Sequence, residues 1–216
     1  MKVLHRLLAV ITGIVPLALA ILLTLPTMAG THELCPTLFN PNGTPRGLES
    51  SIYKWQAVLR RAATESEQTS PAVESWLQFL DGLTQLPARE ILERVNAYVN
   101  RARYRRDEDR IATKMDCWAT PGELFAEGGD CEDYAIAKYL SLRRLGFPPA
   151  ALHIQVSYNR TTCKIHAALV AILDGQDYIL DNRLPEVVVQ ERILNFIPLY
   201  ALNENRWWVH RSRLGP

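Results

Sequence analysis

The stretch of sequence that most constrains this chain runs from Gly128 to Asp133, where a single cysteine lies among three carboxylates. The two leading glycines favour a loop, Asp130 is a good N-cap residue, and Asp133 completes a capping box three residues later. Apolar residues then recur at helical spacing until Gly146, a residue typical of helix ends. The pattern predicts a helix that begins with Cys131 at its first position.

The position of Cys131 makes it a candidate nucleophile. A helix N-terminus lowers the pKa of a thiol because the helix dipole stabilises negative charge. The neighbouring Asp130, Glu132 and Asp133 would raise the same pKa by like-charge repulsion unless a cation neutralised them. Carboxylate oxygens favour calcium, although three side chains provide fewer than the roughly 6 to 8 oxygens that calcium binds. The alternative interpretation is an ordinary helix start, with acidic caps and a small buried cysteine.

Residues 1–29 have the features of an export signal. A basic start is followed by a segment from Leu7 to Leu25 without any charged residue, and small residues precede a cleavage point after Ala29. The apolar segment is close to the roughly 20 residues that span a bilayer, so an uncleaved inner-membrane anchor is the alternative. We expect a periplasmic mature chain, residues 30–216, that forms a single domain.

The charge balance excludes one class of function. The chain has 24 Lys and Arg against 23 Asp and Glu, and cleavage after Ala29 would remove Lys2 and Arg6 but no acidic residue. A net charge this close to zero does not favour binding to nucleic acid.

The four cysteines leave the disulfide pairing open. In an exported protein they could form two disulfides. If Cys131 is a free thiol, three cysteines remain and one of them has no partner. A bridge between Cys35 and Cys117 is possible, but the spacing does not select it.

The N-terminal half of the mature chain is expected to be helical. Apolar residues at helical spacing predict helices over Leu48–Ala63, Val73–Leu83 and Pro87–Tyr104. The sequence Thr120-Pro121-Gly122-Glu123 predicts a further short helix that starts with a capping box and ends at Gly128. The charge cluster Arg101–Asp109 is interpreted as a solvated face.

After the cysteine helix the period of the apolar residues changes to that of strands. Alternation predicts a half-buried strand over Leu152–Tyr158, with His153 on its polar, solvated side. The next strand, Ile165–Leu173, is apolar on both faces, so His166 lies at the start of a buried strand and needs a partner. Further strands are expected over Asn195–Val209.

The pair Asp174-Gly175 is a strong hairpin signal and sets the register of the second and third strands. A two-residue loop pairs Leu173 with Gln176. In that register His166 faces Arg183, and His166 and Asp181 are diagonal neighbours on one face of the sheet. The hairpin therefore predicts a contact between an imidazole and a carboxylate.

The order of the candidate catalytic residues along the chain is that of papain and the transglutaminases. A cysteine on a helix N-terminus is followed by a histidine and an aspartate on neighbouring antiparallel strands. His166 would form a thiolate–imidazolium pair with Cys131, and Asp181 would orient the imidazole. The backbone N–H of Cys131 would be an oxyanion donor. We expect an α+β fold, in which a helical N-terminal half packs on an antiparallel sheet.

Several motifs resemble one family specifically. They are Trp118-Ala119-Thr120-Pro121 with Glu123, the segment from Gly129 to Lys138, His166, and Leu180-Asp181-Asn182. In these motifs the chain closely resembles the bacterial transglutaminase-like cysteine proteases of the LapG type. The motifs lie between Trp118 and Trp208, whereas the N-terminal helices match only in general character.

The resemblance implies a calcium-dependent periplasmic protease that cuts a large surface adhesin near a pair of alanines and so regulates biofilm attachment. It also implies a partner, an inner-membrane cyclic-di-GMP receptor that holds the protease inactive. The implied catalytic triad is Cys131, His166 and Asp181, and the implied calcium ligands are Asp130, Glu132 and Asp133. Methionine often follows the histidine in this family, whereas Ala167 follows it here.

Two other functions are compatible with the same residues. The triad could transfer an acyl group to another acceptor, as in a transglutaminase or an amidase, and incorporation of an amine would reveal this activity. Alternatively, the chain could be a non-catalytic calcium-binding interaction module, which would require broken triad geometry.

Overall fold

The computed structural model describes residues 38, 40, 42–65, 70–106 and 118–210. The chain divides into two compact units, Met1–Leu34 and Cys35–Pro216, and the description below concerns the second. The expected export signal or anchor in residues 1–29 lies outside the described residues. Within the described ranges, no helix combines the length and the apolar character needed to cross a membrane.

The N-terminal half of the described region is helical. Its helices are α1 (Leu48–Glu65), α2 (Pro71–Asp81), α3 (Ala88–Val99), α4 (Pro121–Glu127) and α5 (Cys131–Arg144). The expected short helix is confirmed as α4, where Thr120 caps the N-terminus and forms a capping box with Glu123. The expected start of the cysteine helix is also confirmed, because Asp130 is the N-cap of α5 and Cys131 is its first residue.

Helix α3 is shorter than the sequence pattern predicts. We expected a helix to Tyr104, but α3 ends at Val99 and Asn100 is its C-cap. The side chain of Asn100 donates hydrogen bonds to the backbone oxygens of Asp181 (3.1 Å) and Leu184 (3.0 Å). The chain then leaves the helix and forms a parallel bridge with the loop before α5. Long-range contacts therefore end the helix before its apolar pattern does.

The C-terminal half forms one antiparallel sheet. Its strands are β1 (Leu152–Asn159), β2 (Lys164–Leu173), β3 (Gln176–Leu180), β4 (Val188–Val189), β5 (Phe196–Leu202) and β6 (Trp207–Val209), with single 3₁₀ turns η2 (Pro149–Ala151) and η3 (Gln190–Arg192). The strand order is β4-β3-β2-β1-β5-β6. The sequence did not indicate β4, which pairs only through two residues of β3.

The hairpin between β2 and β3 has the expected register. Leu173 pairs with Gln176 across a two-residue loop. Both loop residues, Asp174 and Gly175, have positive φ angles of 52° and 77°. A type I′ turn requires positive φ at both positions, and its twist matches that of the strands.

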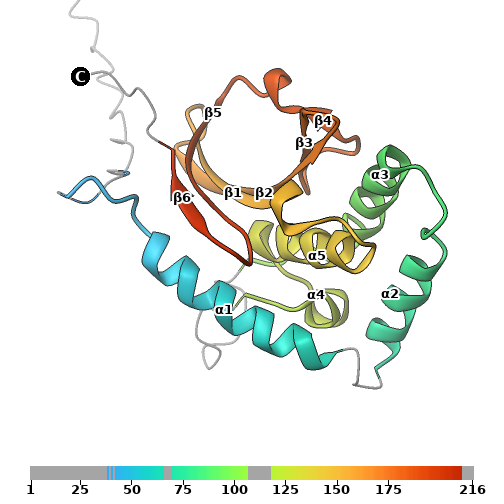
Figure 1. Ribbon diagram of the computed structural model, residues 1–216. Coiled ribbons are helices and arrows are strands. Elements are labelled where there is room, and N and C mark those ends of the chain that lie inside the picture. The colour runs from blue at the N-terminus through green and yellow to red at the C-terminus, as the bar shows by residue number, and fades with distance from the viewer. Residues whose placement is uncertain (1–37, 39, 41, 66–69, 107–117, 211–216) are drawn as a thin grey trace, which may run out of the picture. The chain divides into compact units, whose positions relative to one another are not determined.

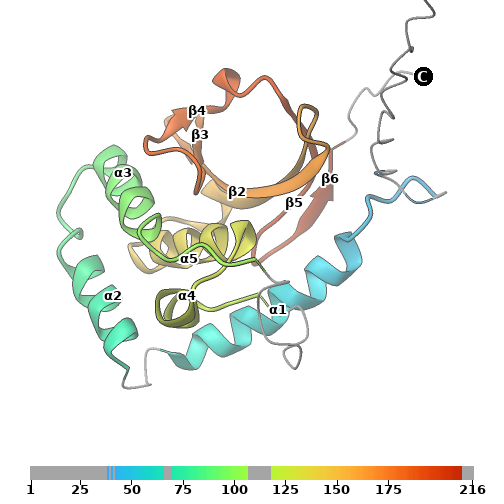
Figure 2. The same ribbon diagram turned by 180° about the vertical axis from the view of Figure 1, so that it is seen from behind.

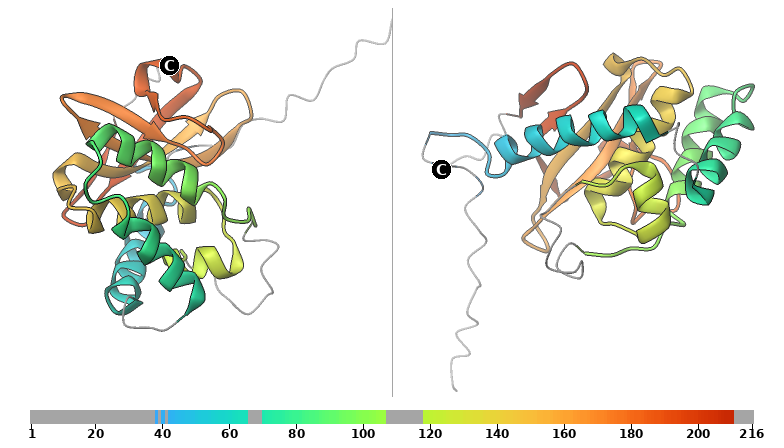
Figure 3. Two further views of the ribbon diagram at one scale, coloured as in Figure 1. Left: turned by 90° about the vertical axis from the view of Figure 1, so that its right-hand side faces the viewer. Right: turned by 90° about the horizontal axis from the view of Figure 1, so that it is seen from below.

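The described helices lie on one side of a curved sheet, and α5 packs directly against it (Figures 1 and 2). Helices α1, α2 and α4 form an outer layer around α5 (Figure 3). The core between these layers consists of fully buried residues from both halves of the chain, among them Val58, Val95, Leu124, Ile136, Leu142, Ile154, Leu169 and Leu180. The expected α+β architecture is confirmed.

One strand residue lies in a different environment from the one we expected. His153 on β1 is only 8% exposed, because Trp208 of β6 packs over it with the two ring centroids 5.1 Å apart. Burial lowers the pKa of His153 to about 4. The prediction of a solvated imidazole was therefore wrong.

The cysteines of the chain have distinct states. Cys131 is free, whereas Cys163 is disulfide-bonded. The two other cysteines of the sequence, Cys35 and Cys117, lie outside the described residues. The suggested Cys35–Cys117 bridge therefore stays a prediction.

Candidate active site

The loop before α5 is held by a neighbouring backbone segment. The N–H of Gly129 donates to Arg103 O (3.1 Å), and the N–H of Arg105 donates to Gly129 O (2.8 Å). Gly128 has a φ of 85°, and a Cβ at this position would lie 2.5 Å from Arg103 O. Only glycine fits such an approach. The segment from Arg103 to Arg105 thus holds the loop that leads into α5 and Cys131.

Asp133 is a structural cap of α5. Its side chain is buried, and its two oxygens accept hydrogen bonds from the N–H groups of Asp130 (3.1 Å) and Ala119 (2.7 Å). A Cβ on Gly129 would lie 2.2 Å from Asp133 Oδ2, which explains the second glycine. The structure therefore gives Asp133 a capping role between α4 and α5.

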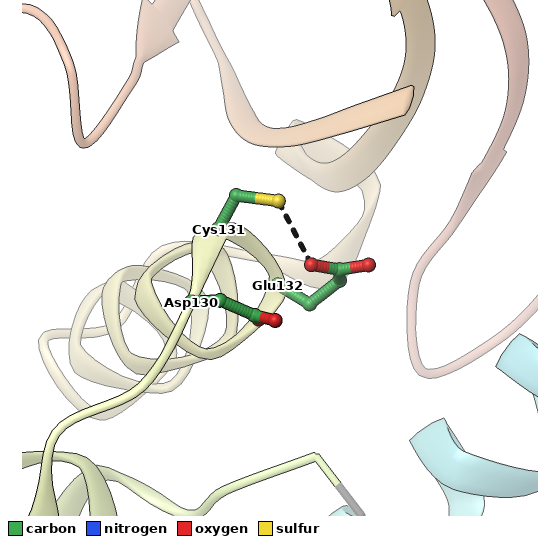
Figure 4. A group of neighbouring side chains, drawn as sticks. All are labelled: Asp130, Cys131 and Glu132. Carbon is green, nitrogen blue, oxygen red and sulfur yellow. Dashed lines mark hydrogen bonds between the residues drawn. The ribbon is translucent and has the colours of Figure 1, made fainter. Parts of the chain in front are cut away.

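Asp130 and Glu132 lie together with the nucleophile (Figure 4). Carboxylate oxygens of both residues and the Sγ of Cys131 all lie within 4.8 Å of one another. The thiol of Cys131 donates a hydrogen bond to Glu132 Oε2 at 2.8 Å. Burial and the charge of Glu132 raise the pKa of the Cys131 thiol, while the backbone N–H of Ala167 opposes this rise. In this arrangement the sulfur is a protonated thiol.

His166 and Asp181 form the second half of the site. Nε2 of His166 on β2 lies 2.9 Å from Oδ2 of Asp181, which follows β3 directly. His166 is 8% exposed and Asp181 is 3% exposed. When Nε2 is engaged with a carboxylate, Nδ1 is the ring nitrogen that can exchange a proton with another group.

Arg183 is a member of this cluster that sequence reasoning missed. Its backbone N–H donates to Asp181 Oδ1 (2.9 Å), and its guanidinium donates to Oδ1 (3.2 Å) and Oδ2 (3.0 Å). Burial alone would raise the pKa of Asp181, but the hydrogen bonds from His166 and Arg183 outweigh it and hold that pKa well below its usual range. The expected register already placed Arg183 opposite His166, and that signal was not used.

The two halves of the site meet at one cavity. Cys131 and His166 line a cavity of about 390 Å³, whose walls also include Tyr104, Asn182 and Arg183. His166 and Asp181 in addition line a second cavity, of about 320 Å³, on the sheet face that points away from α5. A substrate carbonyl that enters the first cavity would meet both the sulfur and the imidazole.

The residues around Cys131 fit part of a calcium site. Asp130 and Glu132 supply hard oxygen ligands within reach of one another, and calcium prefers such ligands. The soft sulfur of Cys131 is not a calcium ligand of this type. Backbone oxygens or water would have to complete a shell of roughly 6 to 8 oxygens.

Comparison with protein families identifies the chain. The model described as bacterial transglutaminase-like cysteine proteinase BTLCP matches residues 72–213. The chain belongs to this family. No curated protein matches the chain in sequence.

The fold is also similar to that of a solved protein, LapG. Calcium-bound LapG of Legionella pneumophila is 26% identical to this chain, with a TM-score of 0.59, and the match covers 73% of this chain and 88% of that one. EGTA-treated LapG is likewise 26% identical, with a TM-score of 0.59, and covers 72% and 86% of the respective chains. The family and these likenesses establish a transglutaminase-like cysteine peptidase.

Proposed function

We propose that this peptidase is a periplasmic, calcium-dependent endopeptidase that cleaves a large cell-surface adhesin and so regulates biofilm attachment. The observation that best supports it is the hydrogen bond between His166 and Asp181 beside the cavity that Cys131 also lines. The proposed triad is therefore Cys131, His166 and Asp181, in the roles of nucleophile, proton carrier and orienting carboxylate.

The first half of the reaction would form a thioester. His166 takes the proton of the Cys131 thiol on Nδ1, and the sulfur attacks the carbonyl carbon of the scissile peptide bond. The backbone N–H of Cys131 stabilises the oxyanion. The carbon–nitrogen bond then breaks, and His166 gives its proton to the departing amine, so that the first product leaves with a new N-terminus.

The second half would hydrolyse the thioester. His166 removes a proton from a water molecule, the resulting hydroxide attacks the acyl carbon, and the carbon–sulfur bond breaks. The proton returns from His166 to the sulfur of Cys131, and the second product leaves as a carboxylic acid. Throughout both steps, Asp181 holds Nε2–H and stabilises the positive imidazolium.

Calcium would be held by Asp130 and Glu132, with the rest of the shell supplied by backbone oxygens and water. It would supply positive charge next to the two carboxylates. Glu132 cannot bind a cation and accept the thiol proton of Cys131 with undiminished strength at the same time. The structure of LapG exists in calcium-bound and EGTA-treated forms, which supports testing the same dependence here.

The substrate, location and partner in this proposal rest on the family resemblance. An adhesin substrate and an inner-membrane cyclic-di-GMP receptor that sequesters the protease both require a periplasmic enzyme. Residues 1–29 have the composition of an export signal, which supports that location. Cell fractionation should recover the mature chain in the periplasm, with a new N-terminus near Gly30.

The deciding experiment incubates the purified mature chain with a large repetitive adhesin encoded near its gene. We expect one cleavage event with calcium, much slower cleavage with excess EGTA, and none with Cys131→Ala. Incorporation of a fluorescent amine without cleavage would instead indicate a transglutaminase. Binding of calcium without any turnover would indicate the non-catalytic module, and a cytoplasmic location would contradict the adhesin substrate.

A further inference from the structure

Lys138 is a buried cation on the same helix as the nucleophile. It follows Cys131 by seven residues, about two helical turns, so both side chains lie on one face of α5. That face is turned toward the sheet, since Cys131 contacts the N–H of Ala167 on β2. Lys138 is 0% exposed, and its Nζ has no hydrogen-bond partner among the described residues. Such a group is costly to bury, so its position needs an explanation.

Two asparagines at the end of α3, the buried Asn96 and the partly buried Asn100, offer acceptor oxygens without partners. Asn96 donates its Nδ2–H to Leu184 O (3.2 Å), and Asn100 donates its Nδ2–H to Asp181 O and Leu184 O. Both amides are therefore oriented by the turn that follows β3. Their Oδ1 atoms are buried and, within the described part of the chain, accept no hydrogen bond.

The asparagines bind the turn that begins at Asp181, and Lys138 lies within reach of the charge of Asp181. Helix α3 packs against α5, Asn100 contacts the backbone of Asp181 directly, and the charge of Asp181 acts on Lys138. An ammonium with up to three N–H donors thus lies in the same buried region as two free acceptor oxygens. Buried groups of opposite type are usually paired directly or through an ordered water molecule.

We propose that Lys138 is a positioning residue for the triad: its ammonium binds the Oδ1 atoms of Asn96 and Asn100, directly or through water, and so fixes the Asp181–Leu184 turn. This inference rests on the triad of the proposed function. Fixing the turn holds the Asp181 carboxylate against His166. Burial lowers the pKa of Lys138 to about 7, and the charge of Asp181 opposes that shift.

The test compares the mature wild-type chain with Lys138→Met, Lys138→Gln and His166→Ala in calcium. Lys54→Met, on α1, is the matched control. Two quantities are measured: the rate of Cys131 alkylation by iodoacetamide at pH 7, located by mass spectrometry, and the ring nitrogen NMR signals of His166. We expect Lys138→Met to lower the alkylation rate roughly tenfold and to shift the His166 signals, because the orienting carboxylate is misplaced. Lys138→Gln keeps a hydrogen-bond donor, so its alkylation rate should fall less than that of Lys138→Met.

The melting temperature separates positioning from stability. Replacement of a buried charge by an apolar side chain is often neutral or stabilising, so Lys138→Met should melt no lower than the wild type. Wild-type alkylation and unchanged His166 signals in Lys138→Met would overturn the proposal. If His166→Ala also reacts at the wild-type rate, the triad itself is wrong, whereas slow His166→Ala beside normal Lys138→Met rejects only the role of Lys138.

A crystal structure of the wild type provides a test that no variant can confound. A direct or single-water contact between Lys138 Nζ and Oδ1 of Asn96 or Asn100 supports the proposal. An ammonium in contact with neither asparagine overturns it.

Discussion

Two carboxylates of the proposed active site, Asp181 of the triad and Glu132 beside Cys131, have opposite surroundings. Asp181 accepts hydrogen bonds from His166 and from the guanidinium of Arg183, and its pKa is lowered. Glu132 accepts a hydrogen bond from the thiol of Cys131, and its charge raises the pKa of that thiol. The first carboxylate is matched by cationic donors of the fold, whereas the second acts against ionisation of the nucleophile.

The difference indicates which half of the site the protein organises by itself. The ion pairs among the described residues include Asp181 twice and do not include Glu132. The histidine half therefore has its positive charge built in. In the cysteine half, an added cation would offset the charge of Glu132 next to the thiol.

The largest loss of activity is expected when either the nucleophile or its base is removed. Cys131→Ala and His166→Ala should each lower the cleavage rate by at least roughly 10⁴-fold, because nucleophile and base act as one unit. Circular dichroism should show an unchanged fold. Near wild-type cleavage by either variant would show that the substituted residue is not part of the catalytic triad.

Asp181→Asn tests the histidine half alone. The amide keeps the shape of the side chain but can no longer hold a positive imidazolium, so the cleavage rate should fall on the order of 10²-fold or more. Steady-state kinetics should show the loss mainly in kcat. A loss confined to KM would mean that Asp181 serves substrate binding instead.

Removal of calcium tests the cysteine half. Excess EGTA should lower the cleavage rate roughly 10- to 100-fold, and calcium should restore it better than magnesium, which demands tighter octahedral geometry. Asp130→Ala and Glu132→Ala should have the same effect with calcium present. Full activity in EGTA would show that these carboxylates are only helix caps.

Arg183→Gln should remove the positive charge that binds Asp181. Its effect on the cleavage rate should be smaller than that of Asp181→Asn. We expect a several-fold loss of activity, since His166 still binds the carboxylate and the arginine is partly exposed. Asp181 has a lowered pKa when folded, so its stabilising contribution is complete above roughly pH 4 and is lost as the pH falls through the folded value. The variant should unfold at a higher pH during acid titration, and an unchanged midpoint would contradict this assignment.

Asp133→Ala should separate the structural cap from the calcium ligands. It leaves the N–H groups of Ala119 and Asp130 without their acceptor, which should cost about 1–3 kcal/mol of unfolding free energy. Urea unfolding measures this loss. The calcium concentration for half-maximal activity should stay unchanged in Asp133→Ala, and a large rise would place Asp133 among the ligands after all.

Much of the site could be predicted because its patterns are local. The capping box spans three residues and fixes Cys131 at the start of α5, and the Asp174-Gly175 turn fixes the register that brings His166 to Asp181. Short-range sterics and hydrogen bonds decide both features, so nothing distant in the chain is needed to read them.

The sequence alone could not decide which long-range partners a polar side chain has or how deeply it is buried. The second oxygen of Asp133 is occupied because Ala119, fourteen residues earlier, donates to it, and His153 is buried because Trp208 packs over it. α3 stops early because Asn100 binds the turn after β3. These outcomes depend on contacts between elements far apart in sequence. Local propensity sets the conformation of the backbone, whereas only tertiary packing sets the burial and the partners of a polar side chain.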